Sequence, residues 1–126
     1  MTRIVIKFSG TEVPVKNVLF TVESTDPKVP WVVSYFESLM VQCWYPMTVC
    51  TSSFYLKKLF KEYAERTCDD AKKNLSAKLA DFGFRGSTSV ESAGIGGCAN
   101  LVHFCISDNV YGNHIGMYLI LDIQYT

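Results

Sequence analysis

The chain has 126 residues, with 12 basic and 12 acidic side chains and 48% hydrophobic residues. This length and composition describe about one globular domain and exclude an intrinsically disordered chain. The balanced charge gives no support to a nucleic-acid partner. The richest apolar window, residues 29–50, contains prolines and a glutamate and is a poor membrane span. The first ten residues contain no long apolar run, so we expect a cytoplasmic protein without a membrane partner.

Two strands and a helix are predicted in the first part of the chain. β-branched and aromatic residues dominate segments 3–8 and 18–24, which is typical of strands. Apolar side chains recur at helical spacing over 31–43, and Pro46 is expected to end that helix. The apolar residues 47–51 are then expected to form a short buried strand.

A second helix is predicted after Ser52 and Ser53, whose hydroxyls are candidate N-caps. Helical spacing defines an apolar face that we expect to be buried, and this face consists of Tyr55, Leu56, Leu59, Phe60 and Tyr63. The lysines of the same segment are expected to lie on the opposite, solvated face, and they are Lys57, Lys58 and Lys61.

The second half of the chain is less regular. Residues 76–82 fit either a helix or a strand, and the apolar tail 111–126 reads as a strand whose partner is not identified. Alternation of helices and strands favours the α/β class over an all-α or an all-β fold. No linker or repeat divides the sequence, so we expect a single domain over 1–126.

The five cysteines do not have the close spacing of a zinc or redox motif, and the two histidines, His103 and His114, are far apart in sequence. No metal ligand is therefore assigned. Reduced thiols are the expected state in the cytosol. Cys98 and Cys105 would share one helix face if a helix extended over both.

The stretch 81–97, DFGFRGSTSVESAGIGG, is rich in glycine. Thr88 and Glu91 have the spacing of a capping box, so a helix is predicted to begin near Ser89. Each glycine within that helix costs about 1 kcal/mol relative to alanine. Two explanations of this cost stay open at this point, namely close approach of a neighbouring strand and room for a bound ligand.

The residues in front of this helix have side chains suited to binding. Gly83 and Gly86 permit turn conformations that can direct Phe82 and Arg85 away from the end of a strand. An aromatic ring suits a flat heterocycle, and a guanidinium near a helix N-terminus suits a phosphate-like anion. The alternative is a phenylalanine in the core and an arginine that is a surface residue or an ion-pair partner, and the residue types alone do not decide between these interpretations.

Four segments resemble the nicotinamide phosphoribosyltransferase family, in the family's order and at about its spacing. They are NVLFTVESTDP (17–27), VQCWYPMTVCTSS (41–53), DFGFRGSTSVESAGIGG (81–97) and ANLVHF (99–104). The resemblance covers 17–110, with residues 1–16 matching loosely and the tail 111–126 diverging. It implies a fragment of the irregular α/β barrel of the type II phosphoribosyltransferases.

The resemblance also implies a reaction. The family is a group of pentosyltransferases (glycosyltransferases) that join nicotinamide to phosphoribosyl pyrophosphate. The products are nicotinamide mononucleotide and diphosphate, and the step serves NAD salvage. Family members work as cytoplasmic homodimers and use magnesium and ATP. A nicotinate-using relative is an alternative, but Gly86 after Arg85 and the placement of Asp108 resemble the nicotinamide branch more closely.

Three substrate-binding residues follow from the resemblance. Phe82 occupies the position that stacks on the nicotinamide ring, and Arg85 the position that binds diphosphate and phosphate groups. Asp108 occupies the position that binds the nicotinamide carboxamide, with a plain turn residue as the less favoured alternative. Phe84 stands where the family motif has a tyrosine, which removes one hydroxyl.

The family's catalytic histidine lies in a Pro-Ala-Ala-Glu-His-Ser context that this sequence does not contain. His103 and His114 lie in other contexts, so no catalytic residue is assigned. We therefore expect a truncated nicotinamide phosphoribosyltransferase. The alternative is a non-catalytic fragment that pairs with a full-length subunit or binds ligand only weakly.

Overall fold

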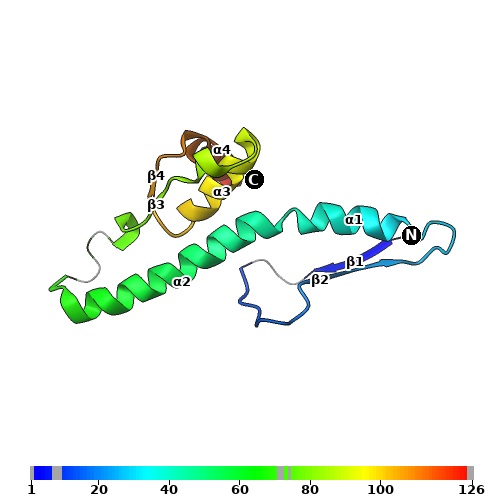
Figure 1. The fold of residues 1–126 in the computed structure, drawn as a ribbon, viewed down its shortest axis with the longest axis horizontal. Helices are drawn as coiled ribbons and strands as arrows, with labels where there is room; N and C mark the ends of the chain where they lie inside the picture. The colour runs from blue at the N-terminus through cyan, green and yellow to red at the C-terminus, as the bar shows by residue number, and fades with distance from the viewer. Residues whose placement is uncertain (1, 7–9, 71–72, 74, 125–126) are drawn as a thin grey trace. The chain divides into compact units, whose positions relative to one another are not determined.

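The computed structural model describes residues 2–6, 10–70, 73 and 75–124. They form two compact units, 1–43 and 44–126, and each unit is described by itself (Figure 1). Both units combine helices with short strands, which is compatible with the predicted α/β class. The single domain expected from the sequence stays a prediction, since a division into compact units does not test it.

The first unit consists of a two-stranded sheet and one helix (Figure 1). β1 (Thr2–Ile6) pairs antiparallel with β2 (Phe20–Ser24), and Ile4 lies opposite Val22. α1 (Val32–Val41) packs against β2. No described residue of this unit is buried. The positions of β1, β2 and α1 confirm the two predicted strands and the first predicted helix. Residues 7 and 8 of the first predicted strand lie outside the described residues.

The second unit begins with α2 (Trp44–Thr67), and here two predictions are wrong. Pro46 does not terminate a helix, because it lies in the first turn of α2. Residues 47–51 are helical and form no strand. Proline is tolerated in a first turn, since the backbone N–H groups there have no intrahelical partner and its fixed φ suits a helix. The break between α1 and α2 instead falls at Gln42 and Cys43.

The predicted caps and the predicted buried face of α2 are also wrong. Ser52 and Ser53 both lie inside the helix, and the Ser53 hydroxyl donates a hydrogen bond to Asn100 Oδ1 at 2.8 Å. Lys57 donates to the carbonyl oxygen of His103, so it belongs to the packed face and not to a solvated one. Most of the predicted apolar face is exposed, and its exposed members are Tyr55, Leu56, Leu59 and Tyr63.

A strand–helix–strand unit follows. β3 (Ala80–Asp81) pairs parallel with β4 (Ile106–Ser107), and α3 (Val90–Leu101) connects them. Parallel strands require such a crossover, which is the element that marks α/β folds. Two single-turn helices complete this part, η1 (Leu75–Ala77) and η2 (Gly83–Gly86). The ambiguous segment 76–82 thus divides between η1 and β3.

The start of α3 is predicted correctly to within one residue. Ser89 is the N-cap, and its Oγ accepts a hydrogen bond from Ser92 N at 3.0 Å. Thr88 is therefore not the capping residue, although Glu91 lies in the first turn as expected and favours the helix dipole. Because α3 ends at Leu101, Cys105 does not share a helix face with Cys98.

The apolar tail is helix α4 (Val110–Gln124), so the strand predicted there is wrong. A continuous apolar run suits a buried helix as well as a buried strand, and periodicity does not separate them. α4 packs on α3 at very short range. A Cβ at Gly112 would lie 2.8 Å from the Cα of Gly97, which leaves no space for a side chain.

The glycines of α3 are explained by this packing. A Cβ at Gly94 would lie 2.5 Å from Ile115 of α4, and one at Gly96 would lie 2.6 Å from the Tyr45 hydroxyl of α2. Of the two explanations open at the sequence level, close approach applies. The approaching elements are helices at Gly94 and Gly96, whereas a Cβ at Gly97 would lie 3.0 Å from Asp81 Oδ2 of β3, the neighbouring strand. The glycines of α3 thus allow close packing against α2, α4 and β3.

Candidate functional site

The candidate site lies at the carboxyl ends of β3 and β4. Asp81 and Ser107 are partners in the parallel register, so Phe82 and Asp108 are the first residues beyond two adjacent strands. The backbone N–H of Asp108 donates to the carbonyl oxygen of Asp81 at 2.9 Å, which continues the pairing by one step. In α/β proteins, ligands bind outside the carboxyl ends of parallel strands. The fold thus brings two of the predicted site residues to the position where such proteins bind ligands.

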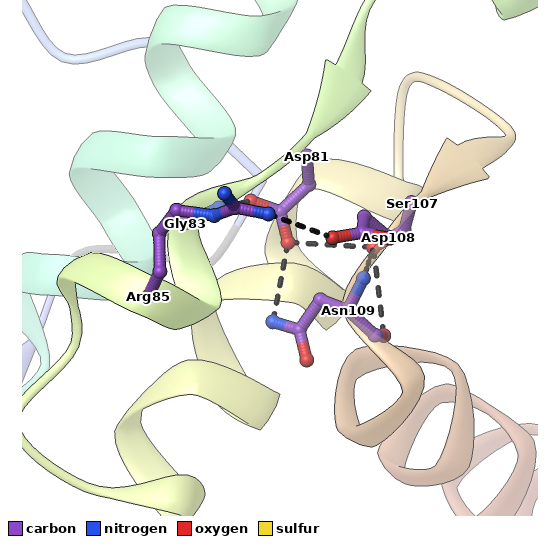
Figure 2. Close-up of polar contacts among 6 residues, drawn as sticks. All are labelled: Asp81, Gly83, Arg85, Ser107, Asp108 and Asn109. Carbon is purple, nitrogen blue, oxygen red and sulfur yellow. Dashed lines mark hydrogen bonds and ion pairs between the residues drawn. The ribbon is translucent and has the colours of Figure 1, made fainter.

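Arg85 reaches the same place from η2. Its Nη2 lies 3.5 Å from Asp108 Oδ2, and Figure 2 shows the guanidinium turned toward that carboxylate. Their side chains are 79% and 56% exposed. An ion pair this exposed contributes about 0–1 kcal/mol to stability. Arg85 is thus an exposed ion-pair partner, which agrees with the plain alternative for this residue. Both charged groups are accessible to a ligand.

Phe82 is also exposed, at 58% of its surface, so the alternative of a core phenylalanine is wrong. It directly precedes η2 and follows β3. Neither Gly83 nor Gly86 has a positive φ, so these glycines do not use a conformation that is closed to other residues. At Gly83 a Cβ would instead lie 2.9 Å from Asp81 Oδ1, which explains the glycine by the approach of a carboxylate.

A polar cluster lies beneath these exposed residues. Asp81 Oδ1 accepts a hydrogen bond from Gly83 N at 2.8 Å, and Asp81 Oδ2 accepts one from Asn109 Nδ2 at 3.2 Å. Ser107 Oγ lies 3.4 Å from Asp81 Oδ2 and accepts from Asn109 N at 3.0 Å (Figure 2). The loops after β3 and β4 are therefore tied to each other by side chains as well as by the backbone.

Asp81, Ser107 and Asn109 were not among the site residues predicted from the sequence. The signal available was the order Ser-Asp-Asn at the end of a short strand, because serine and asparagine side chains bond to nearby backbone groups in such turns. That signal predicts a turn but not its partner, Asp81, which lies 26 residues from Ser107 in sequence.

Phe84 has a contact of its own. Its ring packs edge-on against Tyr111 of α4, with ring centroids 5.5 Å apart. Aromatic pairs in this geometry contribute about 0.5–1.5 kcal/mol beyond the area they bury. Phe84 thus anchors η2 to α4, a contact that does not need the hydroxyl found in the family motif.

Cys50 and His103 form a separate contact, with Cys50 Sγ 3.5 Å from His103 Nε2. Burial, and then the charge of Lys57, lower the pKa of His103. Burial raises the pKa of the Cys50 thiol, and it does the same for Cys98. A nucleophilic cysteine needs a lowered pKa, so this pair does not have the electrostatics of an activated thiol.

The described residues contain no group of three His, Cys, Asp or Glu side chains placed to hold a metal ion. In the same described residues, no helix combines the length and apolarity that crossing a bilayer requires.

Comparison with known proteins identifies relatives of this chain by sequence. The chain is 48% identical over 101 residues to the nicotinamide phosphoribosyltransferase of Xanthomonas campestris pv. campestris (strain 8004), which covers 80% of this chain and 22% of that protein. The chain is a homologue of nicotinamide phosphoribosyltransferases. The resemblance stated from the sequence is thereby confirmed.

Two mycoplasma relatives have the same name. The nicotinamide phosphoribosyltransferase of Mycoplasma pneumoniae (strain ATCC 29342 / M129 / Subtype 1) is 34% identical over 98 residues, covering 75% of this chain and 22% of that protein. That of Mycoplasma genitalium (strain ATCC 33530 / DSM 19775 / NCTC 10195 / G37) is 30% identical over 109 residues, covering 82% of this chain and 24% of that protein. The chain thus spans less than a quarter of the length of these relatives. No family model matches the chain.

Proposed function

We propose that this chain carries the part of a nicotinamide phosphoribosyltransferase that recognises nicotinamide and diphosphate. The observation that carries the proposal is the exposure of Phe82, Arg85 and Asp108 at the carboxyl ends of two paired strands. The homologues named for this activity support it. On this proposal the strand–helix–strand unit is a fragment of the α/β barrel of type II phosphoribosyltransferases.

Phe82 would hold the pyridine ring of nicotinamide by stacking. Base–aromatic stacking is worth about 1–3 kcal/mol. When the ring nitrogen forms its bond to the ribose, the ring becomes a pyridinium cation, and the face of Phe82 would stabilise that cation by about 0.5–2 kcal/mol. The exposed ring of Phe82 thus favours the product side of the reaction more than the substrate side.

Asp108 would select nicotinamide over nicotinate. Its carboxylate can accept a hydrogen bond from the carboxamide NH₂, whereas it repels the carboxylate of nicotinate. Arg85, whose Nη2 lies 3.5 Å from Asp108 Oδ2, would exchange part of this ion pair for the charge of a diphosphate group. Asp108 would therefore accept a hydrogen bond from the carboxamide, and Arg85 would donate hydrogen bonds to the diphosphate.

The chemical step transfers a phosphoribosyl group. The ring nitrogen attacks the anomeric carbon while diphosphate leaves, so the protein mainly aligns the reactants and balances separating charge. The sequence does not contain the family's histidine motif, and we assign no catalytic residue. We propose that these 126 residues recognise the substrate without completing the transfer alone. A cytoplasmic homodimer that uses magnesium and ATP is the corresponding expectation for the whole enzyme.

Isothermal titration with nicotinamide tests this proposal. The folded chain should bind nicotinamide, and Phe82→Ala should weaken the affinity at least about tenfold through loss of stacking. Tyr55→Ala is the control, because Tyr55 is 54% exposed, close to the 58% of Phe82, but lies on α2. Equal affinities for the wild-type and Phe82→Ala chains would contradict the proposal. Nicotinamide mononucleotide detected by mass spectrometry would show that the chain also completes the transfer.

A second candidate function is pairing with a full-length subunit without ligand binding. The observation that favours it is the exposed apolar face of α2, made of Tyr55, Leu56, Leu59 and Tyr63. Sedimentation with a full-length nicotinamide phosphoribosyltransferase separates the two candidates. Co-sedimentation that persists in Phe82→Ala and is lost in Leu59→Glu, in a chain that does not bind nicotinamide, would favour pairing.

A further inference from the structure

We propose that Asn109 is a positioning residue for the nicotinamide site, a proposal that rests on the function proposed above. Its side chain does not face the ligand side. It holds the loops that carry Arg85 and Asp108 in one arrangement and acts through Asp81.

Asn109 is almost completely buried, with 1% of its surface exposed, and its amide makes three hydrogen bonds. Nδ2 donates to the carbonyl oxygen of Ala93 at 2.6 Å and to Asp81 Oδ2 at 3.2 Å. Oδ1 accepts from Gly112 N at 3.1 Å. One side chain thus connects α3, β3 and the first turn of α4. A buried amide bonded on all sides is fixed in a single orientation, because any other leaves polar groups unpaired.

Two glycines provide the room for this amide. A Cβ at Gly97 would lie 2.6 Å from Asn109 Nδ2 and 3.0 Å from Asp81 Oδ2. A Cβ at Gly112 would be stopped by the backbone of Gly97. The close crossing of α3 and α4 therefore shapes the space that Asn109 and Asp81 share.

The bonds of Asn109 and its partners constrain the exposed residues on both loops. On the β3 side, Asp81 bonds Asn109 through Oδ2 and Gly83 N through Oδ1, and Gly83 begins the turn that carries Arg85. On the β4 side, Asp108 lies between Ser107 and Asn109, and its own N–H bonds to Asp81 O. Figure 2 shows the Asn109 amide turned toward Asp81, and the Arg85 guanidinium turned toward Asp108.

A purely structural role for Asn109 predicts a different result from a positioning role. Loss of a structural bond lowers the stability of the unit as a whole. Loss of a positioning bond loosens the two loops more than the rest and weakens ligand binding. Ser53 supplies a matched control, since it is 3% exposed and bonds Asn100 between α2 and α3, away from both loops.

The experiment compares Asn109→Ala with Ser53→Ala in the full 126-residue chain by amide hydrogen exchange and by nicotinamide titration. We expect Asn109→Ala to raise the exchange rates of the Gly83 and Asp108 amides and to weaken nicotinamide binding, each about tenfold, as expected for the loss of a hydrogen bond. Ser53→Ala should leave both quantities unchanged at a similar loss of melting temperature. Equal effects of the two variants, or no effect of Asn109→Ala, would overturn the proposal.

The positioning role of Asn109 can still be tested if nicotinamide does not bind or if Asn109→Ala does not fold. If the wild-type chain does not bind nicotinamide, the proposed function fails, and hydrogen exchange at Gly83 and Asp108 still decides the positioning role. If Asn109→Ala does not fold, Asp81→Asn replaces it, because this change puts an amide opposite Asn109 Nδ2 without altering the helix crossing. Unchanged exchange at the Asp108 amide in Asp81→Asn would overturn the proposal.

Discussion

Two regions of the second unit differ sharply in how they are built. Where α3 crosses α4, glycines and small residues bring backbones together, and Asn109 and Ala93 are each 1% exposed. Beyond the strand ends, Phe82 and Arg85 are mostly exposed and have few partners in the described structure. The residues that pack the helices are thus buried, whereas the residues proposed to bind ligand are exposed. The polar cluster around Asp81 links the two regions.

The largest effect is expected from filling the helix crossing. A Cβ at Gly112 would lie 2.8 Å from Gly97 Cα, and backbone atoms cannot move aside as a flexible side chain can. We expect Gly112→Ala to lower the free energy of unfolding by about 1–3 kcal/mol, the usual cost of overpacking. Urea unfolding followed by circular dichroism measures it.

Gly116→Ala on the same helix is the control for this prediction. Its Cβ would meet nothing closer than 3.9 Å. The gain in helix propensity should then raise stability, by up to about 1 kcal/mol. Equal stability changes in the two variants would mean that the crossing is not the close contact described here.

A smaller effect is expected from a substitution in the exposed loops beyond the strand ends. Asp108→Asn removes the negative charge that repels nicotinate but retains an oxygen acceptor. We expect the ratio of nicotinamide affinity to nicotinate affinity to fall about tenfold, the range for one charge-assisted hydrogen bond. Competition titrations with the two ligands measure this ratio.

The melting temperature should stay within about a degree of wild type, since an exposed ion pair contributes little to stability. An unchanged ratio in a variant that still binds nicotinamide would remove Asp108 from the site and return it to the role of a turn residue.

The smallest effect is expected in the pH dependence of stability, through the partly buried His103. Burial and the charge of Lys57 lower the pKa of His103 in the native state. As the pH falls below about 6.5, the unfolded chain takes up a proton that the native chain resists, so stability falls with falling pH. We expect His103→Gln to lose less stability than wild type between about pH 7.5 and 5.5. Parallel loss in the two proteins would show that His103 does not contribute.

Much of the local structure follows from the sequence. The strands at 20–24 and 3–6 and the start of α3 near Ser89 are set by residue type and by a capping hydroxyl, which act over a few positions. The binding roles predicted for residues of the loop 81–86 came from the family resemblance and not from the spacing of residue types. The roles of Phe82, Arg85 and Asp108 stay predictions, although the fold brings Arg85 and Asp108 to 3.5 Å.

The features that were missed depend on contacts between distant residues. An apolar pattern on α2 could not show that Ser53 would face Asn100, 47 residues away, and leave Tyr55 and Leu59 exposed. Pro46 has the same covalent geometry at the start of a helix as at its end. Asn109 carries no distinctive signal on its own, since its role depends on the space that Gly97 leaves.

The most direct test of the account is to map where nicotinamide binds. The ¹⁵N-labelled chain should be titrated with nicotinamide while its amide resonances are followed by NMR. The account predicts saturable shifts at Phe82, Gly83 and Asp108, with small changes on the exposed face of α2. Shifts confined to other parts of the chain, or no shifts in a folded sample, would contradict the claim that these strand ends form the nicotinamide site.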